Sequence, residues 1–112
     1  MRILFVENHS VFARMAIDQF LAGEAVALVP SLATARSALK EGCFDAVLVD
    51  FDLDDGKGTE LVAELREAGF AGRIVAVSSH AAGNDALRAA GADSICRKAD
   101  FAQLSAVLHA AR

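Results

Sequence analysis

Short apolar runs alternate along the chain with segments of mixed polarity. Four runs are clear, at residues 3–6, 25–29, 46–49 and 74–77, and a weaker fifth lies at 94–96. Each run is continuously hydrophobic, which is typical of strands that are covered on both faces in a parallel sheet. We therefore expect five parallel strands.

The segments between these runs repeat apolar residues at spacings of three and four, which predicts amphipathic helices. A fourth, short and Ala-rich helix is expected at about residues 84–90. Gly42, Gly69 and Gly91 each follow a periodic segment, where a left-handed C-cap favours glycine. The periodic positions are Phe12, Met15, Ala16 and Phe20, then Ala35, Ala38 and Leu39, then Leu61, Leu65 and Ala68, and finally Phe101, Leu104, Val107 and Leu108.

Strand and helix thus alternate five times within 112 residues, without a linker or repeat. This pattern predicts a single α/β domain over residues 1–112, with a doubly wound parallel sheet and helices on both faces. In such folds, ligands bind outside the carboxyl ends of the strands. Candidate functional residues are therefore expected at that edge.

Composition narrows the possible functions. Hydrophobic residues make up 54% of the chain and aromatic residues only 6%, so the core is expected to be aliphatic. The net charge of −4 leaves no broad basic surface, and we expect no direct binding to nucleic acid or to a membrane. Cys43 and Cys96 lack the spacing of a metal site and are interpreted as reduced thiols. With no signal peptide or membrane span, a cytoplasmic protein is expected.

Polar residues follow the predicted strands where chemistry is expected. Two neighbouring carboxylates at a sheet edge can hold Mg²⁺, which prefers oxygen ligands. A hydroxyl and an ammonium group on flanking strands could then bind a phosphoryl group carried by one carboxylate. The residues are Glu7, Asn8 and His9 after the first strand, Asp50 and Asp52 after the third, Ser78 and Ser79 after the fourth, and Lys98 after the fifth.

Four segments together resemble the response-regulator receiver domain of two-component signalling, of the stand-alone chemotaxis type. The resemblance covers essentially the whole chain and implies a flavodoxin-like sheet in strand order 2-1-3-4-5. The segments are Val6-Glu7-Asn8-His9, Val47-Leu48-Val49-Asp50 with Gly58 eight residues later, Val77-Ser78-Ser79, and Gly91-Ala92-Asp93 followed by Lys98.

The resemblance also implies roles for these residues. Asp50 would accept a phosphoryl group from a histidine kinase or phosphotransfer protein, Ser78 would contact the phosphate, and Lys98 would pair with Asp50. Mg²⁺ would be held by Glu7, Asn8, Asp50 and Asp52. The domain would not be an enzyme; it would signal in trans to a protein partner, as a monomer or weak dimer.

The chain departs from the family pattern at several of these positions. Asn8 stands where the family has a carboxylate, so Mg²⁺ binding is expected to be weakened. Asp54 replaces a customary proline, and Asp52 and Asp55 add negative charge nearby. Ile95 stands in place of an aromatic residue, and Ala99 stands where a proline is usual. The segment between Ser78 and Lys98 is also short, which favours a trimmed fourth helix or a trimmed loop before it.

Alternative interpretations use the same residues. A phosphorylation-independent pseudo-receiver is favoured by Asn8 and the short fourth helix. A haloacid-dehalogenase-like phosphatase would use Asp50 as nucleophile and Asp52 as general acid and base, but that motif normally opens its fold. Ser78 could instead be a loop hydroxyl that bonds its own backbone. His9 and His80 are interpreted as polar surface residues, and a nucleotide module is disfavoured because residues 7–13 contain no glycine.

Overall fold

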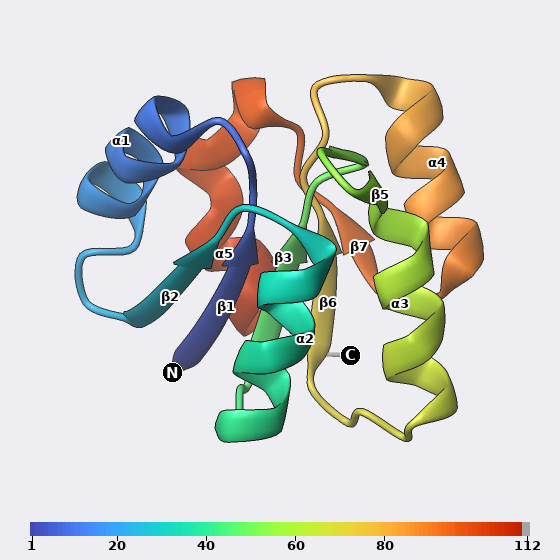
Figure 1. The fold of residues 1–112 in the computed structure, drawn as a ribbon. Coiled ribbons are helices and arrows are strands. Elements are labelled where there is room, and N and C mark those ends of the chain that lie inside the picture. Colours follow the sequence, from blue (N-terminus) through green and yellow to red (C-terminus); the bar gives the residue numbers. More distant parts are fainter. Residues whose placement is uncertain (111–112) are drawn as a thin grey trace.

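The computed structural model describes residues 1–110 and contains a five-stranded parallel sheet (Figure 1). The strand order β2-β1-β3-β6-β7 confirms the predicted flavodoxin-like order 2-1-3-4-5. Because all the strands are parallel, their carboxyl ends share one edge. The strands are β1 (Arg2–Val6), β2 (Ala25–Val29), β3 (Ala46–Val49), β6 (Arg73–Ala76) and β7 (Ser94–Ile95).

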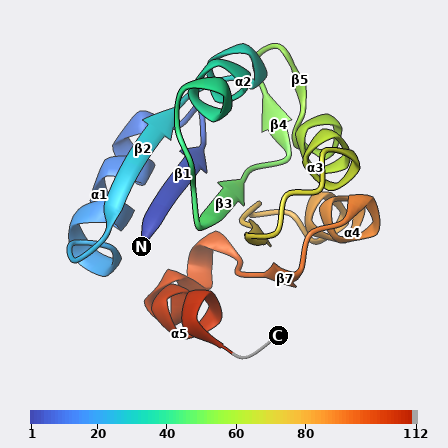
Figure 2. The ribbon, with the colours of Figure 1, turned by 90° about the horizontal axis from the view of Figure 1, so that it is seen from below.

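Helices cover both faces of the sheet, as Figure 2 shows in the view from below. Residues of α2, α3 and α4 pack with Leu4, Val6, Val47 and Val49 on one face. Residues of α1, η1 and α5 pack on the opposite face. The helices are α1 (Ser10–Phe20), α2 (Leu32–Glu41), α3 (Gly58–Glu67), α4 (Ala81–Ala90), the 3₁₀ helix η1 (Lys98–Gln103) and α5 (Leu104–His109).

The central strand β3 shows why its sequence is continuously apolar. All four of its residues are fully buried. Val47 and Val49 point into the core beneath α2, α3 and α4, whereas Ala46 and Leu48 point into the core beneath α1 and α5. Successive strand residues point to opposite faces, so a strand with two covered faces needs apolar side chains at every position.

Some predicted boundaries were wrong. The fourth helix is longer than the predicted 84–90: α4 begins at Ala81 and has ten residues, because the amide of Asn84 already donates to the carbonyl of His80. The last helix begins as the 3₁₀ turns of η1, and the backbone is kinked there at Asp100, whose angles are not helical. Gly69 and Gly91 have positive φ angles, as predicted, but Gly42, the C-cap of α2, is extended with φ −150°.

A small hairpin that the apolar pattern did not predict lies between β3 and α3. Its strands are β4 (Asp52–Leu53) and β5 (Gly56–Lys57), which pair antiparallel. Gly56, which begins β5 directly after the turn, has φ +150°, a backbone conformation that side-chain-bearing residues rarely adopt. The hairpin places the acidic residues after Asp50 at the edge where the parallel strands end (Figure 1).

Within residues 1–110, no helix combines the length and the apolar character needed to cross a bilayer.

Candidate functional site

Backbone hydrogen bonds fix the chain where the strands end. The amide of Glu7 donates to the carbonyl of Val29, and the amide of Asp50 donates to that of Val6. The ladder therefore extends one residue past β1 and β3 and holds both acidic residues at the sheet edge. Their side chains lie in the protein interior, with Glu7 only 1% and Asp50 only 4% exposed.

Lys98 brings the end of the fifth strand to these two carboxylates. Its Nζ lies 2.6 Å from Oε1 of Glu7 and 3.3 Å from Oδ2 of Asp50. The ammonium group also lies over the ring of Phe12, 5.1 Å from the ring centre. The remaining Asp50 oxygen, Oδ1, accepts a hydrogen bond from the amide of Phe51. The structure thus brings together three of the residues that the sequence placed at the site.

The site carries more negative than positive charge. Burial raises the pKa of Glu7 above its ordinary value of 4.5, and the neighbouring Asp50 raises it further, while Lys98 lowers it. One ammonium group faces two buried carboxylates at this point. Such an excess of negative charge favours the binding of a cation.

Asn8 offers an oxygen that is suited to a metal ion. Its Nδ2 donates to Oδ1 of Asp54 at 3.0 Å, which orients the amide group. Its Oδ1 is buried and has no hydrogen-bond partner. A buried acceptor without a partner is costly unless something binds it. By their chemical type, oxygens of Glu7, Asn8 and Asp50 are ligands that a hard divalent cation such as Mg²⁺ prefers.

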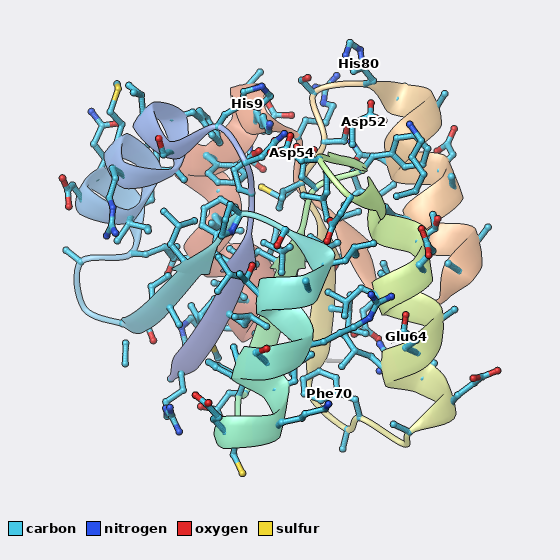
Figure 3. All side chains as sticks on the ribbon, viewed as in Figure 1. His9, Asp52, Asp54, Glu64, Phe70 and His80 are labelled. Carbon is cyan, nitrogen blue, oxygen red and sulfur yellow. The ribbon has the colours of Figure 1, made fainter. Side chains whose placement is uncertain are left out.

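The other acidic residues after Asp50 are engaged elsewhere. Asp52 forms an ion pair with Lys57 across the hairpin, and its side chain is 62% exposed. Asp55 accepts hydrogen bonds from the amides of Leu32 and Ala33 at the start of α2. Figure 3 shows Asp52 and Asp54 at the same edge of the molecule as His9. The structure does not bring the Asp52 carboxylate into the cluster of Glu7 and Asp50, although the sequence predicted it as a metal ligand.

Ser78 is held by a residue that sequence reasoning missed. Oδ1 of Asn84 accepts from the amide of Ser78 at 2.9 Å, and Nδ2 of Asn84 donates to the Ser78 carbonyl at 2.9 Å. Both residues are buried. The Ser78 hydroxyl accepts a hydrogen bond from the amide of His80 at 3.2 Å. The available signal was an amide side chain at the start of a helix that follows a serine loop.

Gly58 has a steric role beside the phosphoacceptor candidate. A Cβ atom at this position would lie 2.0 Å from the carbonyl oxygen of Asp50. The amide of Gly58 also donates to the carbonyl of Phe51 at 2.7 Å. Only glycine lets α3 begin this close to the backbone after β3, which gives the spacing from Asp50 to Gly58 a physical reason.

Fold and site together define a doubly wound α/β domain with an acidic, lysine-paired pocket at the carboxyl edge of its sheet. The family model of the response regulator receiver domain matches residues 3–109, and the chain belongs to this family. It is a receiver domain of two-component signalling, a signalling module and not a classical enzyme, which excludes the phosphatase alternative. Receiver domains bind a divalent metal and partner with histidine kinases.

Solved structures of other proteins share the fold. A response regulator from Burkholderia pseudomallei, solved with a phosphorylated aspartic acid, a calcium ion and citrate, has a TM-score of 0.84 and 24% identity. The match covers 97% of this chain and 66% of that one, so this chain spans slightly less than two thirds of that protein's length.

Two receiver domains described as CheY-like are also similar. The domain from Methylobacillus flagellatus has a TM-score of 0.80 and 26% identity over 96% of this chain and 95% of its own. The domain from Methanospirillum hungatei has a TM-score of 0.77 and 22% identity, over 87% of this chain and 80% of its own. No curated protein matches the sequence.

Proposed function

We propose that Asp50 accepts a phosphoryl group from a histidine kinase or phosphotransfer protein, and that the domain then signals to a protein partner in trans. The observation that carries this proposal is the placement of the Asp50 carboxylate, at the carboxyl edge of the sheet and 3.3 Å from the ammonium group of Lys98. A carboxylate oxygen of Asp50 would attack phosphorus, an oxygen–phosphorus bond would form, and the phosphorus–nitrogen bond of the phosphohistidine donor would break.

The surrounding residues support this chemistry by their positions. The amide of Phe51 fixes one oxygen of Asp50, and Lys98 faces the other. After transfer, the Lys98 ammonium would pair with the phosphate, because charge-assisted contacts are stronger than neutral ones. Ser78 would turn its hydroxyl from the His80 amide toward a phosphate oxygen. Burial of the pocket strengthens each of these electrostatic contacts.

Glu7, Asn8 and Asp50 would hold Mg²⁺, and Asp52 would have to leave Lys57 to join them. When bound, the ion neutralises negative charge on the transferred phosphoryl group. Asn8 contributes an oxygen but no charge, so we expect weaker Mg²⁺ binding than a carboxylate at this position would give. The unpartnered Oδ1 of Asn8 supports this assignment.

The test is phosphorylation by a small phosphodonor such as acetyl phosphate in the presence of Mg²⁺. We expect intact-mass spectrometry to show the gain of one phosphoryl group. Asp50→Asn and excess chelator should abolish this gain, whereas Asp85→Asn, a control at an exposed carboxylate on α4, should keep it. A label on His9, His80 or Asp52 would contradict the assignment. The absence of any label on a folded, Mg²⁺-bound domain would favour the phosphorylation-independent pseudo-receiver.

A further inference from the structure

The ring of Phe12 contacts the ammonium group that faces the two buried carboxylates. The Nζ of Lys98 lies over this ring, 5.1 Å from its centre, and a cation within roughly 6 Å of a ring centre is attracted to the aromatic face. The same Nζ lies 2.6 Å from Oε1 of Glu7 and 3.3 Å from Oδ2 of Asp50. The neighbours of the ammonium group are therefore two carboxylates and one aromatic face.

Packing against other aromatic rings fixes Phe12 in this position. Phe12 lies in the first turn of α1, and its ring packs on that of Phe101 with the ring centres 5.4 Å apart. Phe101 is buried and packs in turn on the buried ring of Phe5 in β1, with the ring centres 6.1 Å apart. Lys98 begins η1 and Phe101 lies in the same short helix, so one element carries both the ammonium group and the ring that supports Phe12.

The side chain of Lys98 needs such support because it is long and charged. A lysine ammonium is a strongly hydrated point charge on a flexible four-carbon stem. In this structure the Lys98 side chain is only 15% exposed, so little water surrounds it. An aromatic face attracts a cation by its quadrupole and does not require a directed hydrogen bond. The ring can therefore keep its contact with the ammonium group when that group turns from a carboxylate oxygen toward a phosphate oxygen.

We propose that Phe12 is a positioning residue for Lys98: its ring holds the ammonium group at the pocket and so speeds phosphoryl transfer to Asp50. The inference rests on the proposed function and adds a residue that acts on the reaction without touching the phosphoryl group. A positive charge that is already in place stabilises the negative charge of the transition state, whereas a mobile one must first be ordered. An aliphatic side chain at position 12 would fill much of the same space without attracting the ammonium group.

The experiment changes the electrons of the Phe12 ring while leaving its size nearly unchanged. Phenylalanines that carry one, two or three fluorine atoms on the ring replace Phe12, because each fluorine weakens the negative ring face that attracts the cation. The rate of phosphoryl gain with acetyl phosphate and saturating Mg²⁺ should fall stepwise along this series. Phe12→Leu, which removes the ring, should lower the rate about fivefold, within the range of a desolvated contact between a cation and a ring.

The matched control is Phe20→Leu on the same helix. Phe20 is half-buried against the same core as Phe12 and lies at the end of α1, roughly 12 Å from Phe12 along the helix axis. Within residues 1–110, no cation lies over its ring. We expect Phe20→Leu to lower the melting temperature much as Phe12→Leu does, and yet to accept the phosphoryl group at the wild-type rate.

A second measurement does not depend on phosphorylation. In the unphosphorylated domain, NMR relaxation of the Lys98 ε-methylene group reports how firmly the end of this side chain is held. We expect its order parameter to fall in Phe12→Leu and to keep the wild-type value in Phe20→Leu, because only the first substitution removes the ring beneath the ammonium group.

Three outcomes would overturn the inference: a rate that does not change along the fluorinated series, a Phe20→Leu variant that reacts as slowly as Phe12→Leu, or a Lys98 order parameter that is the same in Phe12→Leu and in the wild type. Failure of the proposed function reads differently. In that case the wild type would gain no phosphoryl group, while the loss of Lys98 order in Phe12→Leu would remain.

Discussion

The side-chain amide of Asn8 donates a hydrogen bond of 3.0 Å to the carboxylate of Asp54, which lies 46 residues further along the chain. This contact joins the loop after β1 to the hairpin after β3. It also explains how the chain accommodates an acidic residue where the family has a proline. The neutral amide of Asn8 serves as a donor to Asp54, which a carboxylate at the same position could not do.

Asn8→Asp should therefore have two opposite effects. It places a carboxylate against Asp54 and near Glu7 and Asp50, so we expect a lower melting temperature in chelator, because close like charges repel. It also adds a charged ligand, and Mg²⁺ should bind about tenfold more tightly, equivalent to roughly 1.4 kcal/mol. Calorimetric Mg²⁺ titrations and melting curves with and without Mg²⁺ measure both effects.

A second substitution tests whether the Asn8–Asp54 contact is the cause. In the double variant Asn8→Asp and Asp54→Asn, an amide donor again faces a carboxylate. We expect most of the stability lost in chelator to return, while the tighter Mg²⁺ binding persists. If Asn8→Asp alone leaves Mg²⁺ affinity unchanged, Asn8 does not contact the metal.

Replacing Lys98 by Met should destabilise the domain by about 3 kcal/mol at neutral pH in chelator, because it leaves two buried carboxylates without their cation. Lys98 lowers the pKa of Glu7 against the effect of burial, so its removal lets that pKa rise further. An acid whose pKa is raised in the folded state stabilises the fold at pH values below its ordinary pKa of 4.5. This stabilisation is lost as the pH rises through the folded-state pKa. The stability deficit should therefore shrink as the pH falls from 8 to 5.

The matched control for Lys98→Met is Lys57→Met. Lys57 pairs with Asp52 on the hairpin, where both side chains are mostly exposed. Exposed ion pairs contribute about 0–1 kcal/mol, so the free energy of unfolding of this variant should stay close to that of the wild type at pH 8 and at pH 5. Urea denaturation of the three proteins gives the comparison. Equal effects of the two substitutions would show that Lys98 is not a buried counter-ion.

The parallel sheet and the place of the site could be predicted because they depend on patterns local to the chain, whereas the strand order was implied only by the resemblance to receiver domains. Continuous apolar runs such as residues 46–49 require two covered faces, and Asp50 directly follows that run. Parallel strands then bring such end residues to one edge. The positions of Glu7, Asp50 and Lys98 at one edge follow from these two facts alone.

The contacts that adjust the site could not be predicted in this way, because they join residues far apart in sequence. The bond from Asn8 to Asp54 spans 46 residues, and the bond from Leu32 to Asp55 spans 23. Which of several neighbouring acidic residues faces the pocket depends on the hairpin, whose strands have only two residues each. Strands this short leave no periodic signal.

Asn84→Ala should cost about 2–3 kcal/mol, because it leaves the buried amide and carbonyl of Ser78 without partners. The loop that carries the Ser78 hydroxyl would loosen at the same time. Chemical denaturation measures the loss, and hydrogen exchange of the Ser78 amide reports the loop. The control is Asp85→Ala, an exposed residue on the same helix, for which we expect a change within about 0.5 kcal/mol. Similar losses in both variants would contradict a specific role for Asn84.

Ile95 bears on how far phosphorylation would spread through the domain. Its half-buried side chain packs against the core beneath α2, α3 and α4 and offers neither a ring nor a hydroxyl. After addition of phosphodonor and Mg²⁺, we expect NMR shifts near Asp50 and Ser78, small shifts in β7 and α5, and no tight dimer in sedimentation. Ile95→Tyr should enlarge the shifts in β7. Large shifts or tight dimerisation of the wild type would contradict this expectation.

Asp55 links the hairpin to α2, and its effect on stability should depend on pH. The amides of Ala33 and Leu32 lower the pKa of Asp55 from its ordinary value of 3.8. The first turn of α2 has no acidic residue of its own, so Asp55 supplies negative charge to the helix N-terminus. An acid whose pKa is lowered in the folded state stabilises the fold at pH values above its ordinary pKa. This stabilisation disappears as the pH falls through the lowered pKa.

Asp55→Asn should thus lower the melting temperature at pH 7, and the difference from the wild type should narrow as pH falls below 3.8, the ordinary value for this group. The measurement is a series of melting curves from pH 7 to pH 3. Asp18→Asn, at an exposed position on α1, is the control and should follow the wild type throughout. A difference that stays constant with pH would mean that the shape of Asp55, and not its charge, holds α2.

Asp54 contacts Asn8, and the neighbouring Asp55 contacts the start of α2. If the hairpin moves as one unit, the Asp55→Asn variant should therefore also change the affinity of the domain for Mg²⁺.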